Sequence, residues 1–275
     1  MSESEDVLIC HNEGILELQL NRPEARNALS GRLSNDLQSA IRQHAYREET
    51  RCLVLSSSSK VFSVGGDVKG FVKNNNSNDN APAGKLYGLG EEAWTQTLRR
   101  LIDISIMLYE LPKPTIASIP GAAAGGGLSL ALACDYRIAA KSAKINTAFA
   151  NMGVSGDYGC AYFLSRIVGP DKAKDILFSS KTIPTEEALE LGILTDVVAD
   201  NELQDAVNSK AAELAAGPTV AYGYMKKNVQ AALELPLSQY LDMETERMTR
   251  TFKTNDHKRA AKAFVNKVRP VFEGN

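Results

Sequence analysis

The sequence is poor in the residues that bind metals and form disulfides. It has only 4 cysteines and 3 histidines among 275 residues. The cysteines are Cys10, Cys52, Cys134 and Cys160, and the histidines are His11, His44 and His257. They are widely spaced and include no C-x-x-C pair, which argues against both a disulfide framework and a zinc site. We therefore expect no metal centre.

An excess of charge and long apolar runs are also missing. The formal net charge is -2, so nothing in the composition calls for nucleic acid or another polyanion as a partner. No run approaches the apolar length that spans a bilayer, and no membrane association is expected. The first residues, MSESEDVLICHN, resemble neither a secretory signal nor a basic transit peptide. A cytoplasmic location is the expectation.

The first 150 residues predict strands interleaved with helices. The strands are expected at 7–20 (a hairpin turning at Glu13-Gly14), 51–56, 115–119 and 135–139, and the helices after Ser30 as N-cap, at 86–111 and at 127–133. The segment 73–85 is too polar and too rich in Asn, Gly and Pro for a core and is predicted to be a surface loop. This order of elements indicates an α/β core with right-handed crossovers.

The second half of the chain is helical in pattern. Helices are predicted at 162–168, 171–178, 185–191, 202–216, 219–233, 237–254 and 256–268. The last of these are too amphipathic to stand alone in water and are expected to cover the core or another subunit. We place the α/β core at residues 1–200 and a C-terminal helical region at 201–275.

Two glycine-rich stretches could carry chemistry. The first, VFSVGGDVK at 61–69, follows a predicted strand, and its adjacent glycines let a backbone amide approach a ligand closely. A tight turn before a helix capped by Asp67 explains the same residues equally well.

The second glycine-rich stretch, PGAAAGGGLS at 120–129, joins a strand to an apolar helix. Amides in the first helical turn have no partner within the helix and suit a developing oxyanion. Close packing of helix on strand is the structural alternative. The stretch matches neither a phosphate-binding P-loop nor the G-x-G-x-x-G dinucleotide fingerprint, so nucleotide hydrolysis and hydride transfer lose support.

Four motifs in the same order resemble the enoyl-CoA hydratase/isomerase (crotonase) superfamily along nearly the whole chain. They are LNRPEARNAL (20–29), VFSVGGDVK (61–69), PGAAAGGGLSLALACD (120–135) and VGPDKAKDILFSSKTIPTEEALELGILTDVV (168–198). The resemblance implies a ClpP-like spiral of β-β-α repeats with a C-terminal helical region. It also implies a homotrimer or a hexamer that is a dimer of trimers, acyl-CoA thioesters as substrates, and no cofactor beyond the coenzyme A of the substrate.

The resemblance also assigns roles to individual residues. The amides of Gly66 and Gly126 would form the oxyanion hole for the thioester carbonyl. Residues expected along the coenzyme are Ala25, Arg26, Val64, Asp67, Val68 and Lys267, the last often across a subunit boundary. For Lys267, a salt bridge on the surface is the competing explanation.

Family hydratases hold water between two glutamates, and here those positions align with Ser129 and Phe149. Neither residue is a carboxylate base, so water addition by the two-acid route is hard to write. Asp157, eight residues after Phe149, stands where family isomerases often carry a carboxylate. It would also make a good N-cap for a helix starting near Gly159. Ser129, Phe149 and Tyr158 are expected at the acyl pocket, although packing explains Ser129 and Tyr158 as well.

One carboxylate beside an oxyanion hole suits double-bond isomerisation, and an enoyl-CoA isomerase of fatty-acid or aromatic acyl-CoA breakdown is the favoured function. The segment around Asp157 also resembles 4-chlorobenzoyl-CoA dehalogenase, but we identify no residue to activate water. A hydratase-like lyase or hydrolase that uses Asp157 is one alternative. A non-catalytic acyl-CoA-binding homologue is another. The acyl chain is not specified by any of these motifs.

Overall fold

The computed structural model describes residues 6–67 and 90–275. The expected surface loop at 73–85 and the candidate residue Val68 lie outside the described residues. The strands are β1 (Val7–Asn12), β2 (Ile15–Leu20), β3 (Cys52–Ser57), β4 (Thr115–Ile119), β5 (Ala122–Ala124), β6 (Tyr136–Ala140), β7 (Lys144–Asn146) and β8 (Asp196–Val198).

Helices follow the strands and dominate the second half of the chain, as expected. They are α1 (Gly31–Ala40), α4 (Glu91–Leu101), α5 (Asp103–Glu110), α6 (Gly126–Leu132), α7 (Cys160–Val168), α8 (Pro170–Ser179), α9 (Thr185–Glu190), α10 (Leu203–Ala215), α11 (Thr219–Ala232), α12 (Leu237–Phe252) and α13 (Asn255–Val265). Shorter turns are η1 (Pro23–Ala25), η2 (Ile41–Ala45), η3 (Ala150–Met152) and η4 (Asp200–Glu202).

Two local predictions near the N-terminus are confirmed. β1 and β2 form an antiparallel hairpin in which Val7 faces Leu20, and Gly14 at its turn has a positive φ of 80°. Ser30 is the N-cap of α1, and its hydroxyl oxygen accepts a hydrogen bond from the Leu33 amide at 3.1 Å. Both features depend only on neighbouring residues, which is why the sequence predicts them.

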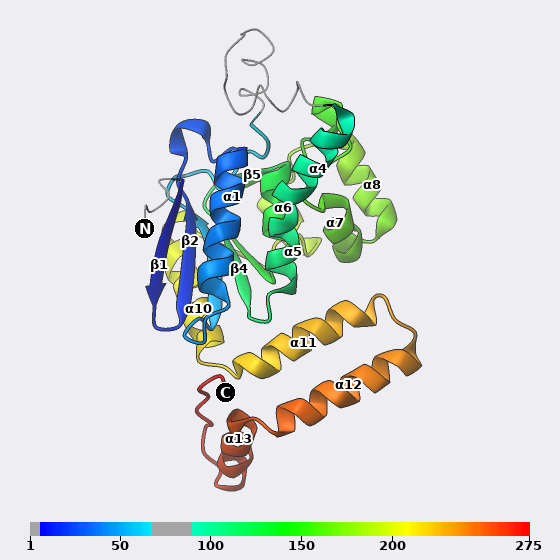
Figure 1. Cartoon of the computed structure of the whole chain (residues 1–275). Helices are drawn as coiled ribbons and strands as arrows, with labels where there is room; N and C mark the ends of the chain where they lie inside the picture. Colours follow the sequence, from blue (N-terminus) through cyan, green and yellow to red (C-terminus); the bar gives the residue numbers. More distant parts are fainter. Residues whose placement is uncertain (1–5, 68–89) are drawn as a thin grey trace.

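The main sheet has the strand order β1-β2-β3-β4-β6-β8, and every pair except β1–β2 is parallel. The carboxyl ends of parallel strands meet at one edge of a sheet. The segments after β3 and β4, which carry the two glycine-rich stretches, therefore leave the sheet at the same edge (Figure 1).

Alternate residues of the central strands face two separate apolar layers. Leu53 and Leu55 of β3 join the larger core, together with side chains from α1, α5 and α6. Cys52 and Val54 face the other way, toward Val207 and other residues of α10. Both faces of the sheet are thus covered by helices (Figure 1), as a mostly parallel sheet requires.

One predicted helix is broken in the structure. The segment predicted as a single helix at 86–111 forms two helices, α4 and α5, which meet at Ile102, while residues 86–89 lie outside the described residues. α4 has no buried residue, whereas α5 buries Ile104, Ser105 and Leu108. The break lets α5 follow the core while α4 runs along the surface, and no Gly or Pro marks it in the sequence.

The small parallel sheet of β5 and β7 was not predicted. Each strand has only three residues, and β5 consists of alanines, so neither is long enough to give a strand signal in the sequence. The last strand of the main sheet, β8, also has three residues and was missed for the same reason.

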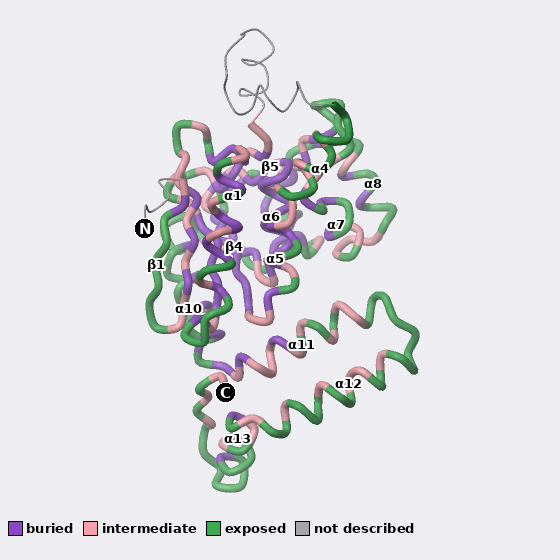
Figure 2. The backbone as a smooth tube through the Cα atoms, viewed as in Figure 1, coloured by how far each residue is buried: buried purple, intermediate pink, exposed green. Residues whose placement is uncertain are grey.

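The C-terminal region divides by packing into two parts. α10 lies on the sheet and buries Leu203, Val207, Ala211 and Leu214 there. α11, α12 and α13 extend away from it as an arm whose surface is mostly exposed or half-buried (Figures 1 and 2). The helical region predicted from residue 201 thus opens with a helix that packs on the core sheet.

The arm is tied to the core mainly along α11. The Lys226 ammonium donates to Asp135 Oδ2 at 2.9 Å and to the Leu108 carbonyl at 3.1 Å. Further along, the Gln230 amide donates to the Tyr109 carbonyl at 2.6 Å. Within the described ranges, no helix is both long enough and apolar enough to cross a bilayer.

Candidate active site

The two glycine-rich stretches lie against each other. The Ser63 amide donates to the Ala122 carbonyl at 3.1 Å, and the Ala124 amide donates back to the Ser63 carbonyl at 2.9 Å. Ser63 and Ala123 thus form an isolated parallel bridge between the segment after β3 and strand β5. Sequence alone predicted both stretches but not this pairing between them.

Gly65 fixes the direction of the Gly66 amide. The Gly65 carbonyl accepts a hydrogen bond from the Leu29 amide at 2.7 Å. Because a trans peptide directs its N–H opposite to its C=O, the Gly66 N–H points away from Leu29. Gly65 itself has φ +83°, and a Cβ there would lie 2.8 Å from the Ala124 carbonyl oxygen. Only glycine allows this close approach of the two backbones.

Gly126 presents its amide at the start of α6. As the first helical residue, it has no partner for its N–H within the helix. The Gly125 carbonyl accepts the Ser129 amide at 3.0 Å along the helix, so the Gly126 N–H points out of the helix end. A Cβ on Gly65 would lie 2.9 Å from the Gly126 nitrogen, which places the two glycine backbones in contact.

Asn27 anchors the first glycine loop and was missed as a site residue, although it stands inside the quoted LNRPEARNAL motif. It is fully buried, with a positive φ of 54°. Its amide nitrogen lies 2.8 Å from Ser57 Oγ, 3.0 Å from the Val61 carbonyl oxygen and 3.1 Å from the Phe62 carbonyl oxygen. Asparagine tolerates left-handed backbone, and that preference was the one signal available in the sequence.

Asp157 lies beside the second glycine loop. A Cβ on Gly126 would lie 3.2 Å from Asp157 Oδ1, and Oδ1 is buried without a hydrogen-bond partner among the described residues. Burial raises the pKa of Asp157 from 3.8 to about 6. The N-cap of α7 is Gly159, and no side chain caps that helix. The Asp157 carboxyl group therefore does not act as the helix cap that its sequence position also allowed.

Apolar groups line the two glycines next to this carboxyl group, Gly126 and Gly156. Leu29 Cδ1 and Tyr158 Cδ2 would lie 3.1 and 2.9 Å from a Cβ on Gly126. The Phe149 ring packs against Gly156, at 3.5 Å from the Cβ position of that glycine. Such walls withhold solvent from an ionised carboxylate, which is why the pKa rises.

Ser129 and Tyr158 both have their hydroxyl groups engaged. Ser129 is fully buried, and its hydroxyl donates to the Gly125 carbonyl at 3.1 Å. The Tyr158 hydroxyl lies 3.1 Å from Ser34 Oγ, and burial raises the pKa of Tyr158 to about 12. Tyr158 is thus a neutral, hydrogen-bonded wall of the site.

Most of the residues expected along the coenzyme lie beside the first glycine loop. Ala25 ends the short turn η1, and the Val64 amide donates to the Arg26 carbonyl at 3.3 Å, so these three lie beside the first glycine loop. Asp67 Oδ2 lies 3.8 Å from Arg22 Nη1 in the same region.

Lys267 comes two residues after α13 (Asn255–Val265), and Figure 1 shows α13 on the arm, away from the core that carries the two glycine loops. The structure brings together the other described candidates but not this one. No cluster of three His, Cys, Asp or Glu side chains that could hold a metal ion occurs within 6–67 and 90–275.

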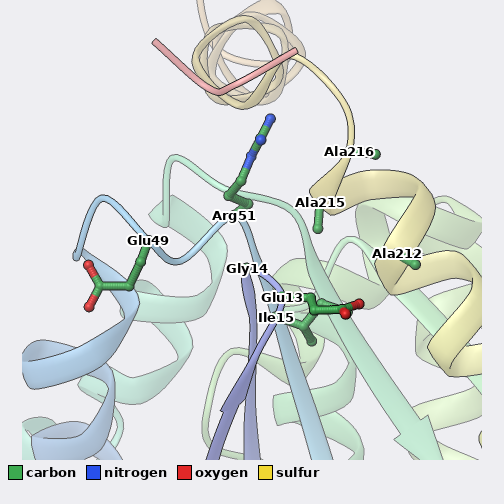
Figure 3. Close-up of a pocket in the computed structure, with 8 residues that line it drawn as sticks. All are labelled: Glu13, Gly14, Ile15, Glu49, Arg51, Ala212, Ala215 and Ala216. Atoms are coloured by element: carbon green, nitrogen blue, oxygen red, sulfur yellow. The ribbon is translucent and has the colours of Figure 1, made fainter. Parts of the chain in front are cut away.

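A pocket at the opposite edge of the sheet is separate from these residues. It lies where β2 and β3 begin and is lined by Glu13, Gly14, Ile15, Glu49, Arg51, Ala212, Ala215 and Ala216 (Figure 3). The Arg51 guanidinium donates from Nη2 to the Gly217 carbonyl at 2.5 Å and from Nη1 to the Phe272 carbonyl at 3.1 Å. Arg51 thus ties the C-terminal tail to the core.

Comparison with known proteins agrees with this arrangement. A family model described as enoyl-CoA hydratase/isomerase matches residues 10–275. The chain belongs to the enoyl-CoA hydratase/isomerase family. Its mixed α/β structure also has the crotonase fold, because its structural neighbours are enoyl-CoA hydratases of that fold: the enoyl-CoA hydratase of Bacillus anthracis superposes with a TM-score of 0.86 at 27% identity, over 98% of this chain and 100% of that chain.

Relatives within this family differ in their reactions. The 1,2-epoxyphenylacetyl-CoA isomerase of Escherichia coli is 31% identical over 98% of this chain and 99% of that protein. The mitochondrial methylglutaconyl-CoA hydratase of Mus musculus is 32% identical over 96% of this chain and 81% of that protein. Family membership supports an acyl-CoA enzyme, and the choice between isomerase and hydratase must come from the side chains.

Proposed function

We propose that the protein is an enoyl-CoA double-bond isomerase in which Asp157 transfers the proton. The observation that carries this proposal is the buried Asp157 Oδ1 beside Gly126, which has no hydrogen-bond partner in the described part of the chain. Neither of the two positions where family hydratases use glutamate holds a carboxylate. The acyl-CoA part of the proposal follows from the family, and the choice of isomerisation over hydration follows from the side chains.

In the proposed reaction, the thioester oxygen of a 3-enoyl-CoA accepts hydrogen bonds from the Gly66 and Gly126 amides. The Asp157 carboxylate then removes a proton from C2, between the carbonyl and the C3–C4 double bond. Negative charge moves to the thioester oxygen, where each such amide is worth roughly 3 to 4 kcal/mol. Protonated Asp157 returns the proton to C4, and the double bond ends between C2 and C3. The steps balance without water, metal or redox cofactor.

The pKa of Asp157 suits both halves of this transfer. A carboxyl group with its ordinary pKa is a weak base and would return the proton too readily, whereas a pKa near the working pH serves removal and return alike. Burial raises the Asp157 pKa to about 6, and no charge among the described residues contributes to this shift. The apolar walls of Leu29, Phe149 and Tyr158 would also keep competing water from the dienolate.

The decisive experiment compares purified protein on 3-enoyl-CoA and 2-enoyl-CoA substrates, with proton exchange at C2 followed in D₂O. We expect conversion of the 3-enoyl to the 2-enoyl thioester, and Asp157→Asn should lower kcat by roughly 10²- to 10⁴-fold. The matched control is Asp171→Asn, which changes an exposed aspartate of α8 and should leave kcat unchanged.

Each of the other possible results would indicate a different function. Fast hydration of a 2-enoyl-CoA that survives Asp157→Asn would identify a hydratase and refute the isomerase. Hydration or thioester hydrolysis lost in Asp157→Asn would identify the Asp157-dependent lyase or hydrolase. Tight acyl-CoA binding without any C2 exchange would identify a non-catalytic homologue. Halide release from a halobenzoyl-CoA would identify a dehalogenase.

We also propose that the chain works as a homotrimer or as a dimer of trimers. Support comes from the arm, whose large apolar side chains are exposed in the single chain. They include Met225, Val229, Leu237, Leu241, Phe252, Phe264 and Val265. A second chain covering this arm could also bring Lys267 toward a neighbouring coenzyme. Light scattering that gives a monomer mass at micromolar concentration would refute the assembly.

A further inference from the structure

The turn that carries Asp157 has an unusual backbone. Gly156, Tyr158 and Gly159 have φ values of +106°, +50° and +80°, so Asp157 is enclosed by residues in conformations that L-amino acids rarely adopt. Glycine accepts such a conformation freely, but tyrosine does not. A non-glycine residue persists there only when its surroundings fix it. The contacts of Tyr158 therefore decide the geometry of this turn.

Two buried serine hydroxyls fix Tyr158, each from a different helix. Ser34 of α1 lies 3.1 Å from the phenol oxygen, and Ser105 of α5 donates to the Tyr158 backbone carbonyl at 2.7 Å. Ser34 is fully buried and Ser105 is 5% exposed. Ser105 is also the one polar residue among the three that α5 buries. A buried hydroxyl needs a hydrogen-bond partner, and the Tyr158 carbonyl is the partner of Ser105 Oγ.

The Asp157 side chain has no such support of its own. Its Oδ1 atom has no hydrogen-bond partner in the described part of the chain, although it lies beside Gly126. Its direction must therefore follow from the backbone on either side of it. Ser34 holds the far end of the Tyr158 ring, whereas Ser105 holds the carbonyl of the peptide that joins Tyr158 to Gly159.

We propose that Ser105 is a positioning residue for Asp157. By holding the Tyr158 carbonyl, its hydroxyl keeps the turn at 156–159 in the conformation that places the Asp157 carboxyl group against Gly126 and away from water. The catalytic consequence rests on the proposed isomerase function, but the structural consequence does not. Without the hydroxyl, the Tyr158 carbonyl loses its side-chain restraint, and the turn keeps the Cys160 amide on the Asp157 carbonyl at 3.2 Å and Ser34 on the Tyr158 ring. Because glycine follows Tyr158, the peptide can then tilt and let the carboxyl group turn toward solvent.

We expect Ser105→Ala to lower both the kcat and the pKa of Asp157. The kcat for 3-enoyl-CoA should fall by about 10- to 100-fold, with KM changed less than about twofold, because general-base catalysis needs a placed base while the coenzyme contacts are untouched. The pKa of Asp157, raised by burial to about 6, should fall toward the ordinary aspartate value of about 3.9 as the group gains water.

The experiment measures kcat, KM and the acidic limb of the pH profile, together with a ¹³C NMR titration of the Asp157 carboxyl carbon assigned with Asp157→Asn. The variants are Ser105→Ala and Ser105→Thr, the second of which keeps a hydroxyl and should restore most of the kcat and the raised pKa. The matched control is Ser56→Ala, which removes a buried serine hydroxyl that donates to Glu17 on β2.

A lower kcat together with a lower Asp157 pKa in Ser105→Ala, and in neither Ser105→Thr nor the Ser56 variant, supports the proposal. An unchanged NMR titration in Ser105→Ala overturns it, whether or not kcat falls. If the wild type fails as an isomerase but its Asp157 pKa still drops in Ser105→Ala, the positioning role stands and the proposed function fails. If Asp157 is essential for isomerisation and Ser105→Ala behaves as wild type, the function stands and the positioning role fails.

Discussion

Replacing Asp157 by asparagine should make the protein more stable while it removes activity. Asp157 is half-buried, its Oδ1 is buried without a hydrogen-bond partner among residues 6–67 and 90–275, and the rise of its pKa from 3.8 to about 6 corresponds to about 3 kcal/mol of folding free energy at 1.36 kcal/mol per pKa unit. The folded-state pKa lies above the unfolded one, so ionisation disfavours the folded state. Asparagine removes this cost because it carries no charge.

The pH dependence of this effect is specific. Below about pH 4, Asp157 is protonated in both the folded and the unfolded state, and the variant should gain little. Between pH 4 and 6 the gain should grow, and above the folded pKa it should level off at up to about 3 kcal/mol. For a chain of this size, that corresponds to a rise in Tm of roughly 5 to 10 °C at pH 8.

Thermal unfolding from pH 4 to pH 8 measures this prediction, with the assembly state checked at each pH. The control is Asp256→Asn, because the Asp256 pKa is lowered: burial opposes the shift, but hydrogen bonds from Arg259 and from the Glu273 and Gly274 amides outweigh it. That variant should lose stability at pH 8 and lose less near pH 4. If Asp157→Asn lowers the Tm, or raises it by the same amount at every pH, then burial of the ionised Asp157 carboxylate does not destabilise the fold.

Three further predictions test other parts of the site. Isomerase kcat should rise with pH through about 6, since Asp157 must be ionised to act as the base, and a kcat flat from pH 5 to 8 would contradict this. Asn27→Ala should destabilise the fold by about 2 to 4 kcal/mol in denaturant unfolding, because the Phe62 carbonyl loses its buried donor and the Arg22 amide loses its acceptor. Gly65→Ala should abolish activity through its contact with the second glycine loop, whereas Gly31→Ala, with open space around its Cβ, should change stability and activity little.

The sequence by itself determined the elements whose signals are local. The hairpin at 7–20 and the helix after Ser30 follow from neighbouring residues, and both appear in the structure. The order of the four motifs at 20–29, 61–69, 120–135 and 168–198 predicted the family and therefore the fold. Asp157 also stood out in the sequence, but as either a base or a helix cap, because spacing along the chain does not say which way a side chain points.

Only the tertiary structure decided between those roles, because the deciding contacts join residues far apart in the chain. Within the residues that the structure describes, Asp157 Oδ1 has no hydrogen-bond partner, because it lies beside Gly126 and does not cap α7. The turn behind it is held by serines from α1 and α5. The anchoring role of Asn27 and the pairing of the 61–66 segment with β5 are equally non-local. A residue's hydrogen-bond partners and its access to water are set by packing, and no periodicity in the sequence encodes them.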